Sequence, residues 1–224
     1  YYYNRFENQF ILRGVKPVLV PVECQYSGKS ISAVDSVYKY ITDFDMGPGD
    51  WIIALGGGGI LDVASFCAAV FCGGINILAV PTTLEAMIEG AVSGRAMLNS
   101  NGHKDEISTR VSYNAVICDP TFLSTVDSKY RSNGYASVIR YAILDDLSLL
   151  TDIVEPTNMR EYLNRVYASR AKIEKIDTRL LTLGDEIAAA IEGYFRFMNY
   201  SSGEALALSL LAAVDDKRRE PLSR

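Results

Sequence analysis

Continuous apolar runs in the first half of the chain predict the strands of a parallel sheet. These runs occupy residues 16–22, 51–55, 75–80 and 113–119. Segments with helical apolar spacing separate them, at residues 31–44 and 60–71. Continuous rather than alternating runs are typical of strands that are covered on both faces, so helices are predicted on each side of the sheet. Ligands of such sheets bind at the carboxyl ends of the strands.

The second half of the chain has a different pattern. From about Asn133 onward, apolar residues recur at three- and four-residue spacing, which predicts a mainly helical region. The predicted fold class is therefore α/β, with a Rossmann-like, parallel-sheet nucleotide-binding domain at residues 1–127. An all-α domain is predicted at residues 128–224.

Composition restricts the classes of partner. The 224 residues are 49% hydrophobic, which is enough to bury a substantial core in one large or two small domains. A formal net charge of −5, a pI near 5.0 and the lack of a basic run argue against nucleic acid and anionic membranes as partners. The expected ligand is a small molecule.

Targeting signals and cysteines bear on the location of the protein. Ser65, Gly73-Gly74 and Asn76 interrupt the apolar segment 63–80, so a helix, a break and a strand are predicted there instead of a membrane span. The first ten residues lack the apolar stretch of a signal peptide, and from their abrupt start a truncated or partly unrepresented N-terminus is expected. Four cysteines without a C-x-x-C pair fit a reducing compartment. A cytoplasmic protein is expected.

A glycine-rich turn follows the predicted strand at 51–55. Residues 56–59 are all glycine, and a predicted helix starts near Ile60. Backbone N–H groups at a helix N-terminus suit a phosphate, although the same glycines also allow tight packing of strand against helix. Asp62, in the first helical turn, is a candidate for orienting a ligand hydroxyl, or it favours the helix dipole.

Five motifs occur in order between Trp51 and Leu210. They are "ALGGGGILDVASFCAAVFCGGINILAVPTTLEAMIEGAVSGR", "ICDPTFLSTV", "SNGYASVIRYAIL", "LGDEIAAAIE" and "SSGEALALSL". The motifs resemble, in this order, those of 3-dehydroquinate synthase and the related sugar-phosphate cyclases. The chain is shorter than a full member of that family, so segments of the family's fold are expected to be missing from it.

The resemblance implies an N-terminal domain that binds NAD and a helical domain that holds a divalent metal, usually zinc, through one Glu and two His. Carried over by motif, those ligand positions fall on Ser137, Asp185 and Ser202. Neutral serine hydroxyls are poor zinc ligands, so no metal is expected. A family histidine with a proton-transfer role corresponds to Ala189, which has no acid–base chemistry.

The resemblance also assigns the cofactor positions. They are Gly56, Gly57, Gly58, Asp62, Thr82, Thr83, Asp119 and Thr125. Leu61 stands where the family has a further glycine, and its branched side chain is expected to hinder close approach of a pyrophosphate. NAD binding is therefore expected to be weakened. The alternative is that these residues now only shape loops.

Three cations stand at positions where the family binds substrate anions, and they are Arg95, Lys104 and Arg140. Arginine in place of lysine keeps the charge but changes donor geometry. They are expected to meet between the two domains and to bind a sugar phosphate. Glu89 replaces an acidic family residue near the metal, and Asp105 adds a negative charge beside Lys104. Whether Lys172 or Lys175 stands for another family lysine is left open.

The leading hypothesis is a dehydroquinate synthase-like protein that has lost its metal site and the associated activity, and that retains nucleotide or sugar-phosphate binding. One alternative is an active lyase, cyclase or NAD-dependent polyol-phosphate dehydrogenase with a rearranged centre. Another is a non-catalytic subunit of an active homologue. The resemblance further implies a homodimer.

Overall fold

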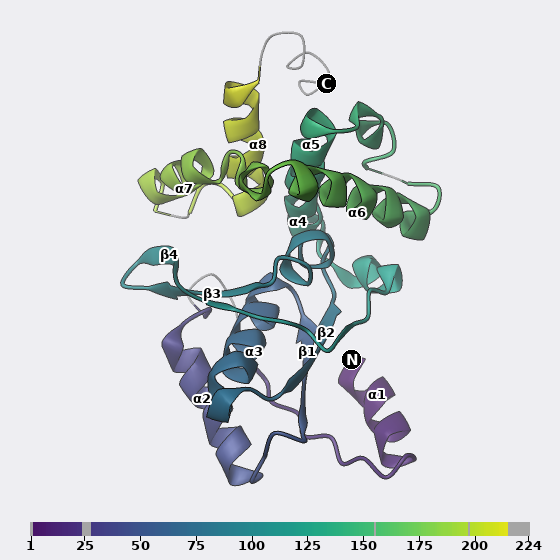
Figure 1. Cartoon of the computed structure of the whole chain (residues 1–224), viewed down its shortest axis with the longest axis vertical. Coiled ribbons are helices and arrows are strands. Elements are labelled where there is room, and N and C mark those ends of the chain that lie inside the picture. The colour runs from purple at the N-terminus through teal and green to yellow at the C-terminus, as the bar shows by residue number, and fades with distance from the viewer. Residues whose placement is uncertain (1, 24–27, 155, 197, 215–224) are drawn as a thin grey trace.

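The computed structural model describes residues 2–23, 28–154, 156–196 and 198–214 (Figure 1). A three-stranded parallel sheet forms the centre of the N-terminal half. Its strands are β1 (Trp51–Gly56), β2 (Asn76–Pro81) and β5 (Ala115–Val116), in the order β1-β2-β5. Trp51 pairs with Asn76, and Leu78 pairs with Ala115. The predicted parallel sheet is confirmed.

Helices accompany the sheet as the apolar spacing predicts. They are α1 (Tyr2–Ile11), α2 (Ile31–Asp43) and α3 (Gly58–Val70). Figure 1 shows α2 and α3 together on one side of the strands and α1 on the other. The side chain of Ser30 caps α2 by accepting a hydrogen bond from the N–H of Ala33. Val37 of α2 and Cys67 of α3 belong to one buried cluster, which joins the two helices.

The strand predicted at residues 16–22 is wrong. Residues 15–23 have no regular secondary structure, although Val20 and Val22 still pack against the cluster formed by α2 and α3. An apolar run becomes a strand only when a neighbouring strand satisfies its backbone groups. The described residues supply no such partner for this segment.

An antiparallel hairpin lies apart from the main sheet. Its strands are β3 (Arg95–Ser100) and β4 (His103–Arg110), and Arg95 pairs with Arg110. Asn101 and Gly102 connect them with positive φ angles of 50° and 80°. Asn-Gly is the preferred sequence for a two-residue turn of this hand. The hairpin extends beneath the helical half of the molecule (Figure 1).

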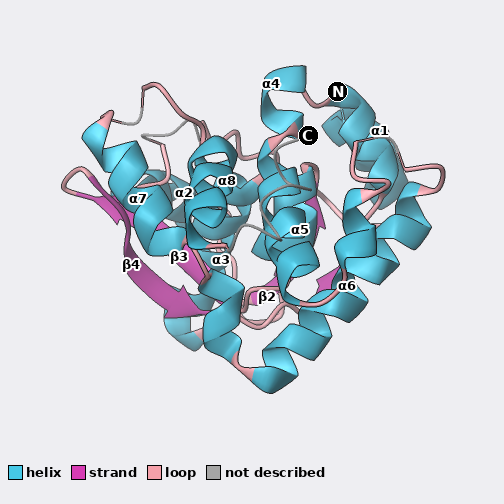
Figure 2. Ribbon diagram, turned by 90° about the horizontal axis from the view of Figure 1, so that it is seen from above, coloured by secondary structure: helices cyan, strands magenta, loops and turns pink. Residues whose placement is uncertain are grey.

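The helical second half is also confirmed. Its helices are α4 (Ser128–Arg131), α5 (Asn133–Leu144), α6 (Met159–Ile176), α7 (Asp185–Tyr194) and α8 (Ser202–Ala213). Short turns connect or precede them, namely η3 (Pro120–Thr125), η4 (Leu147–Leu150) and η5 (Thr178–Thr182). Asn158 caps α6, and Ser201 with Glu204 forms a capping box on α8. Figure 2 shows these helices from above.

One hydrophobic cluster joins the two halves. It contains Val80, Met87 and Ile88 from the sheet side, and Val138, Tyr141 and Val166 from α5 and α6 are part of the same cluster. Met87 and Ile88 lie in η2 (Ala86–Gly90), a short π-type turn after β2. The region where η2 and the hairpin meet α5, α6 and α7 forms the junction between the two halves.

Candidate functional site

The glycine-rich turn lies at the carboxyl end of β1. Gly57 is the N-cap residue of α3, and a Cβ added to Gly57 would lie 3.2 Å from Cγ2 of Thr83. The N–H of Thr82 donates to the carbonyl of Gly56 over 2.9 Å, which joins the ends of β1 and β2. The structure therefore brings these four predicted cofactor residues together at the edge of the sheet where ligands of parallel sheets bind.

Gly58 has open space beside it. A Cβ added to Gly58 would meet no heavy atom within 4 Å. The N–H groups of the first helical turn have no acceptor within the helix, so the turn presents donors beside this space. Leu61 is 1% exposed, and a Cβ on Gly90 would lie 3.3 Å from its Cδ1. The side chain of Leu61 therefore packs into the core.

The carboxylate of Asp62 is held by protein groups. Lys29 lies 2.6 Å from Asp62 and 2.5 Å from Asp105, and the N–H of Met97 donates to Asp62 over 3.1 Å. Burial disfavours the ammonium form of Lys29, but the two carboxylates outweigh burial and raise its pKa. These contacts tie α3 to the hairpin. That Asp62 orients a ligand hydroxyl stays a prediction.

Asp119 and Thr125 lie at the two ends of η3, the turn that follows β5, with Asp119 as the N-cap residue and Thr125 as the last residue. The Asp119 side chain caps this turn by accepting from the N–H of Thr121 over 3.0 Å. The hydroxyl of Thr125 donates to the carbonyl of Phe122 over 2.9 Å. Both side chains thus have local contacts that shape the turn.

The three positions implied as metal ligands come from helices that pack together. Ser137 lies on α5 with 4% exposure, Asp185 is the first residue of α7, and Ser202 is the first residue of α8. A shared apolar cluster joins these three helices. Within the described ranges of the chain, no group of three or more His, Cys, Asp or Glu side chains is arranged to hold a metal ion.

Asp185 forms an ion pair with Arg140. Nη2 of Arg140 lies 2.5 Å from Oδ1 of Asp185, and Nη1 donates to the carbonyl of Leu181. Arg140 is 3% exposed, and its Nε has no hydrogen-bond partner among the residues that the structure describes. Burial raises the pKa of Asp185, although 48% of its side chain is exposed, and Arg140 opposes that rise. A guanidinium therefore holds the carboxylate at this position.

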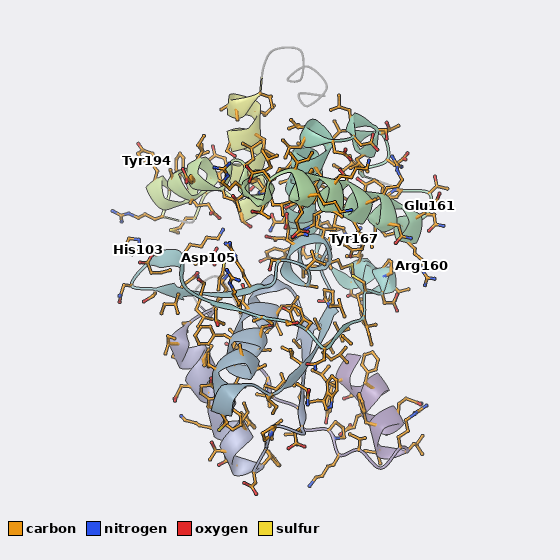
Figure 3. All side chains as sticks on the ribbon, in the orientation of Figure 1. His103, Asp105, Arg160, Glu161, Tyr167 and Tyr194 are labelled. Carbon is orange, nitrogen blue, oxygen red and sulfur yellow. The ribbon has the colours of Figure 1, made fainter. Side chains whose placement is uncertain are left out.

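A second ion pair crosses the junction. Nζ of Lys104, on β4, lies 2.9 Å and 3.1 Å from the two carboxylate oxygens of Glu192, on α7. Glu192 is 3% exposed and the side chain of Lys104 is 27% exposed. Figures 1 and 2 both show α7 beside the tip of the hairpin, and in Figure 3 the labelled His103 and Tyr194 mark these two elements.

Arg95 lies away from the other two predicted cations. It is exposed at the start of β3, opposite Arg110. At the usual rise per residue, Arg110 lies about 20 Å along β4 from Lys104. The structure thus places Lys104 and Arg140 under α7 and places Arg95 at the other end of the hairpin.

Sequence reasoning missed Arg170. It lies on the buried stripe of α6, between Val166 and Ile173, and donates to the carbonyl of Val92 over 3.3 Å. By contrast, the side chain of Lys172 is 66% exposed, and Lys175 is exposed in the last turn. A cation among apolar residues at helical spacing is the signal that marks Arg170.

Sequence reasoning also missed three further polar side chains at the junction, those of Tyr141, Tyr167 and Glu85. Tyr141 donates to Glu89 over 2.6 Å, and burial together with Glu89 raises the pKa of Tyr141. Tyr167 of α6 donates to the carbonyl of Met87 over 3.1 Å (Figure 3). Burial raises the pKa of Glu85, with Lys104 opposing the rise. The junction is therefore polar and closely packed.

Two of the remaining residues of the metal-site motifs are exposed. Glu186 and Ala189 both face solvent on α7, and Glu204 belongs to the capping box of α8.

No helix in the described part of the chain is both long and apolar enough to span a membrane.

Comparison with known proteins identifies relatives. The family described as "3-dehydroquinate synthase N-terminal" matches residues 11–133. The chain is 26% identical to a 3-dehydroquinate synthase of Clostridium kluyveri, over 100% of this chain and 66% of that protein. It is 30% identical to that of Natranaerobius thermophilus, over 91% of this chain and 60% of that protein. The chain thus spans about three fifths to two thirds of these relatives.

Solved structures share the fold. A 2-epi-5-epi-valiolone synthase from Streptomyces hygroscopicus subsp. jinggangensis, with NAD+ and Zn2+ bound, superposes with a TM-score of 0.88 at 18% identity, covering 99% of this chain and 69% of that one. A 2-deoxy-scyllo-inosose synthase complexed with carbaglucose-6-phosphate, NAD+ and Co2+ gives a TM-score of 0.82 at 18% identity, covering 95% and 63%.

Proposed function

Because the chain belongs to the 3-dehydroquinate synthase family, we propose that it binds a nucleotide at the glycine-rich turn and a small anion at the junction but does not carry out metal-dependent cyclisation. The ion pair between Arg140 and Asp185 carries this proposal. The proposal concerns an activity of the whole protein, and this chain spans about three fifths to two thirds of the length of its relatives.

The donor set does not fit a divalent metal. A catalytic zinc needs about three protein ligands from His, Cys, Asp or Glu side chains, whereas Ser137 and Ser202 offer neutral hydroxyls. Asp185 is the only carboxylate among the three positions, and Arg140 already neutralises it. A metal ion at Asp185 would also lie beside a buried like charge, which opposes its binding.

The glycine-rich turn fits a dinucleotide. Support comes from the space beside Gly58, from the N-terminus of α3 and from the inward packing of Leu61. Both similar structures described above contain NAD+. When bound, NAD supplies a hydride acceptor. The part of this chain in that binding is to hold the phosphates through the backbone N–H groups of the turn.

The expected anion is a sugar phosphate or a similar small molecule. One similar structure contains carbaglucose-6-phosphate, and the unpartnered Nε of Arg140 leaves one buried donor available. Two alternatives remain distinct proposals. An active enzyme with a rearranged centre would turn over a polyol phosphate, and a non-catalytic subunit would co-purify with an active homologue. Assembly as a homodimer stays a prediction.

The full-length protein is expected to contain less than about 0.1 equivalent of zinc, cobalt or manganese per chain, because the donor set lacks the ligands that these metals need. Elemental analysis after dialysis against a weak chelator measures this. A matched variant that restores the three family ligands, and the family lysine in place of Arg140, should take up about one zinc. Its substitutions are Ser137→Glu, Asp185→His, Ser202→His and Arg140→Lys. One tightly held ion per wild-type chain would contradict the proposal.

Gly58→Ala is expected to raise the Kd of NAD+ about tenfold or more without lowering the melting temperature. The added Cβ has free space in the protein alone, but it would occupy the space that a bound phosphate needs. Isothermal titration with NAD+ measures the affinity. Gly193→Ala is the matched control, because it also adds a Cβ without neighbours but lies on α7. Equal affinities in all three proteins, or no binding by the wild type, would exclude nucleotide binding at this turn.

A further inference from the structure

Helix α7 supplies the carboxylates that pair with the buried Arg140 and the half-buried Lys104 of the junction. Asp185 pairs with Arg140 and Glu192 pairs with Lys104. The two acidic residues are seven positions apart, which places them on one face of the helix, about 10 Å from each other. A single element therefore presents two negative charges, at a fixed spacing, to two cations from other elements.

Each ion pair has one enclosed member and one more exposed member. Arg140 and Glu192 are each 3% exposed, and the described part of the chain supplies no hydrogen-bond partner for the Nε of Arg140. An enclosed charge needs a countercharge more than an exposed one does, so Arg140 requires an acceptor and Glu192 requires a cation. In this structure the acceptors belong to the protein itself.

The packing of α7 differs from that of its neighbours. Ala188 and Glu192 are the two residues of α7 that are buried, whereas Ile187 and Tyr194 are 47% and 82% exposed. The helix begins after Gly184, whose φ of 90° suits glycine, and Arg196 after its end has a φ of 50°. Helix α7 buries fewer apolar side chains than α5 or α6, and segments with few buried apolar contacts open locally at a lower free-energy cost.

We infer that α7 is an internal occupant of an anion site formed by Arg140 and Lys104, and that a ligand binds there by displacing Asp185 and Glu192. The ligand class that fits is a small dianion, whose two anionic groups take the places of the two carboxylates of α7. This inference rests on the proposed function, because it takes the junction to be the ligand site. In the described state, the two ion pairs of α7 therefore block the anion site.

The test measures the affinity of inorganic phosphate in wild-type protein and in variants that release one cation at a time. Glu192→Gln frees Lys104 and Asp185→Asn frees Arg140. Each is expected to bind phosphate about tenfold more tightly than the wild type, and more so at low salt. Glu186→Gln, an exposed change of equal charge on the same helix, should leave the affinity unchanged.

A double variant assigns the effect to the cation. Lys104→Met with Glu192→Gln should lose the gain that Glu192→Gln alone produces, while circular dichroism confirms that each protein is folded. Folded variants without any gain, or an equal gain in Glu186→Gln, would overturn the inference. Stoichiometric metal in the wild type would overturn the proposed function and leave this contact in place, so the two failures are distinguishable.

Discussion

Release of phosphate from a seven-carbon heptulosonate phosphate is expected to be slower by about a thousandfold or more in the full-length protein than in a 3-dehydroquinate synthase with its metal site. A metal acting as a Lewis acid stabilises transition-state charge by several kcal/mol, and about 4 kcal/mol corresponds to about a thousandfold in rate. The hydroxyls of Ser137 and Ser202 do not replace it. Ala189 adds no proton-transfer group.

A phosphate-release assay with the clostridial relative purified in parallel measures this difference. The protein must be prepared from a host that lacks its own 3-dehydroquinate synthase, because trace contamination would imitate low activity. Activity within about a hundredfold of the relative would show that a rearranged centre performs the reaction. The alternative of an active cyclase would then replace the proposed function.

Lys104→Met is expected to lower the free energy of unfolding by about 3 kcal/mol, which is about a hundredfold in the unfolding equilibrium. Lys104 is the partner of Glu192, and Glu192 is 3% exposed. Methionine keeps the length of the side chain but leaves a buried carboxylate without its countercharge. Denaturant unfolding, monitored by circular dichroism, measures the change.

Two controls show whether the loss comes from the unpaired charge. Removing both charges, in Lys104→Met with Glu192→Gln, should recover most of the lost stability, because an ion pair replaced as a whole is often nearly neutral. Lys39→Met breaks an exposed pair with Asp35 and should change stability by less than about 0.5 kcal/mol. If Lys104→Met behaves like Lys39→Met, Glu192 is not held by Lys104 in solution.

Local patterns in the sequence were sufficient to predict most of the helices and strands. The apolar runs at β1 and β2 and the spacing along α6 each reflect neighbours within a few residues, and the capping box of α8 lies within four residues. Such features depend on backbone geometry and on one buried face. The glycine-rich turn was recognised for the same reason, because a strand, four glycines and a helix are adjacent in the chain.

The predicted strand at residues 16–22 shows where local reasoning ends. Its apolar run has the composition of a strand, but a strand also needs a partner that can be far away in sequence. Arg170 is a residue that the sequence analysis overlooked. Its position on an apolar stripe was visible in the sequence, but its contact with Val92 was not. In both cases the missing information was which segments meet.

The sequence by itself determined the family, the parallel sheet, the helical second half and the residue types at the positions implied for the metal. Only the tertiary structure decided what those residues contact. Lys104 and Glu192 are 88 positions apart, and Arg140 and Asp185 are 45 apart. The physical reason is that an electrostatic contact depends on distance in space and on burial, and both are set by how β4, α5 and α7 pack together.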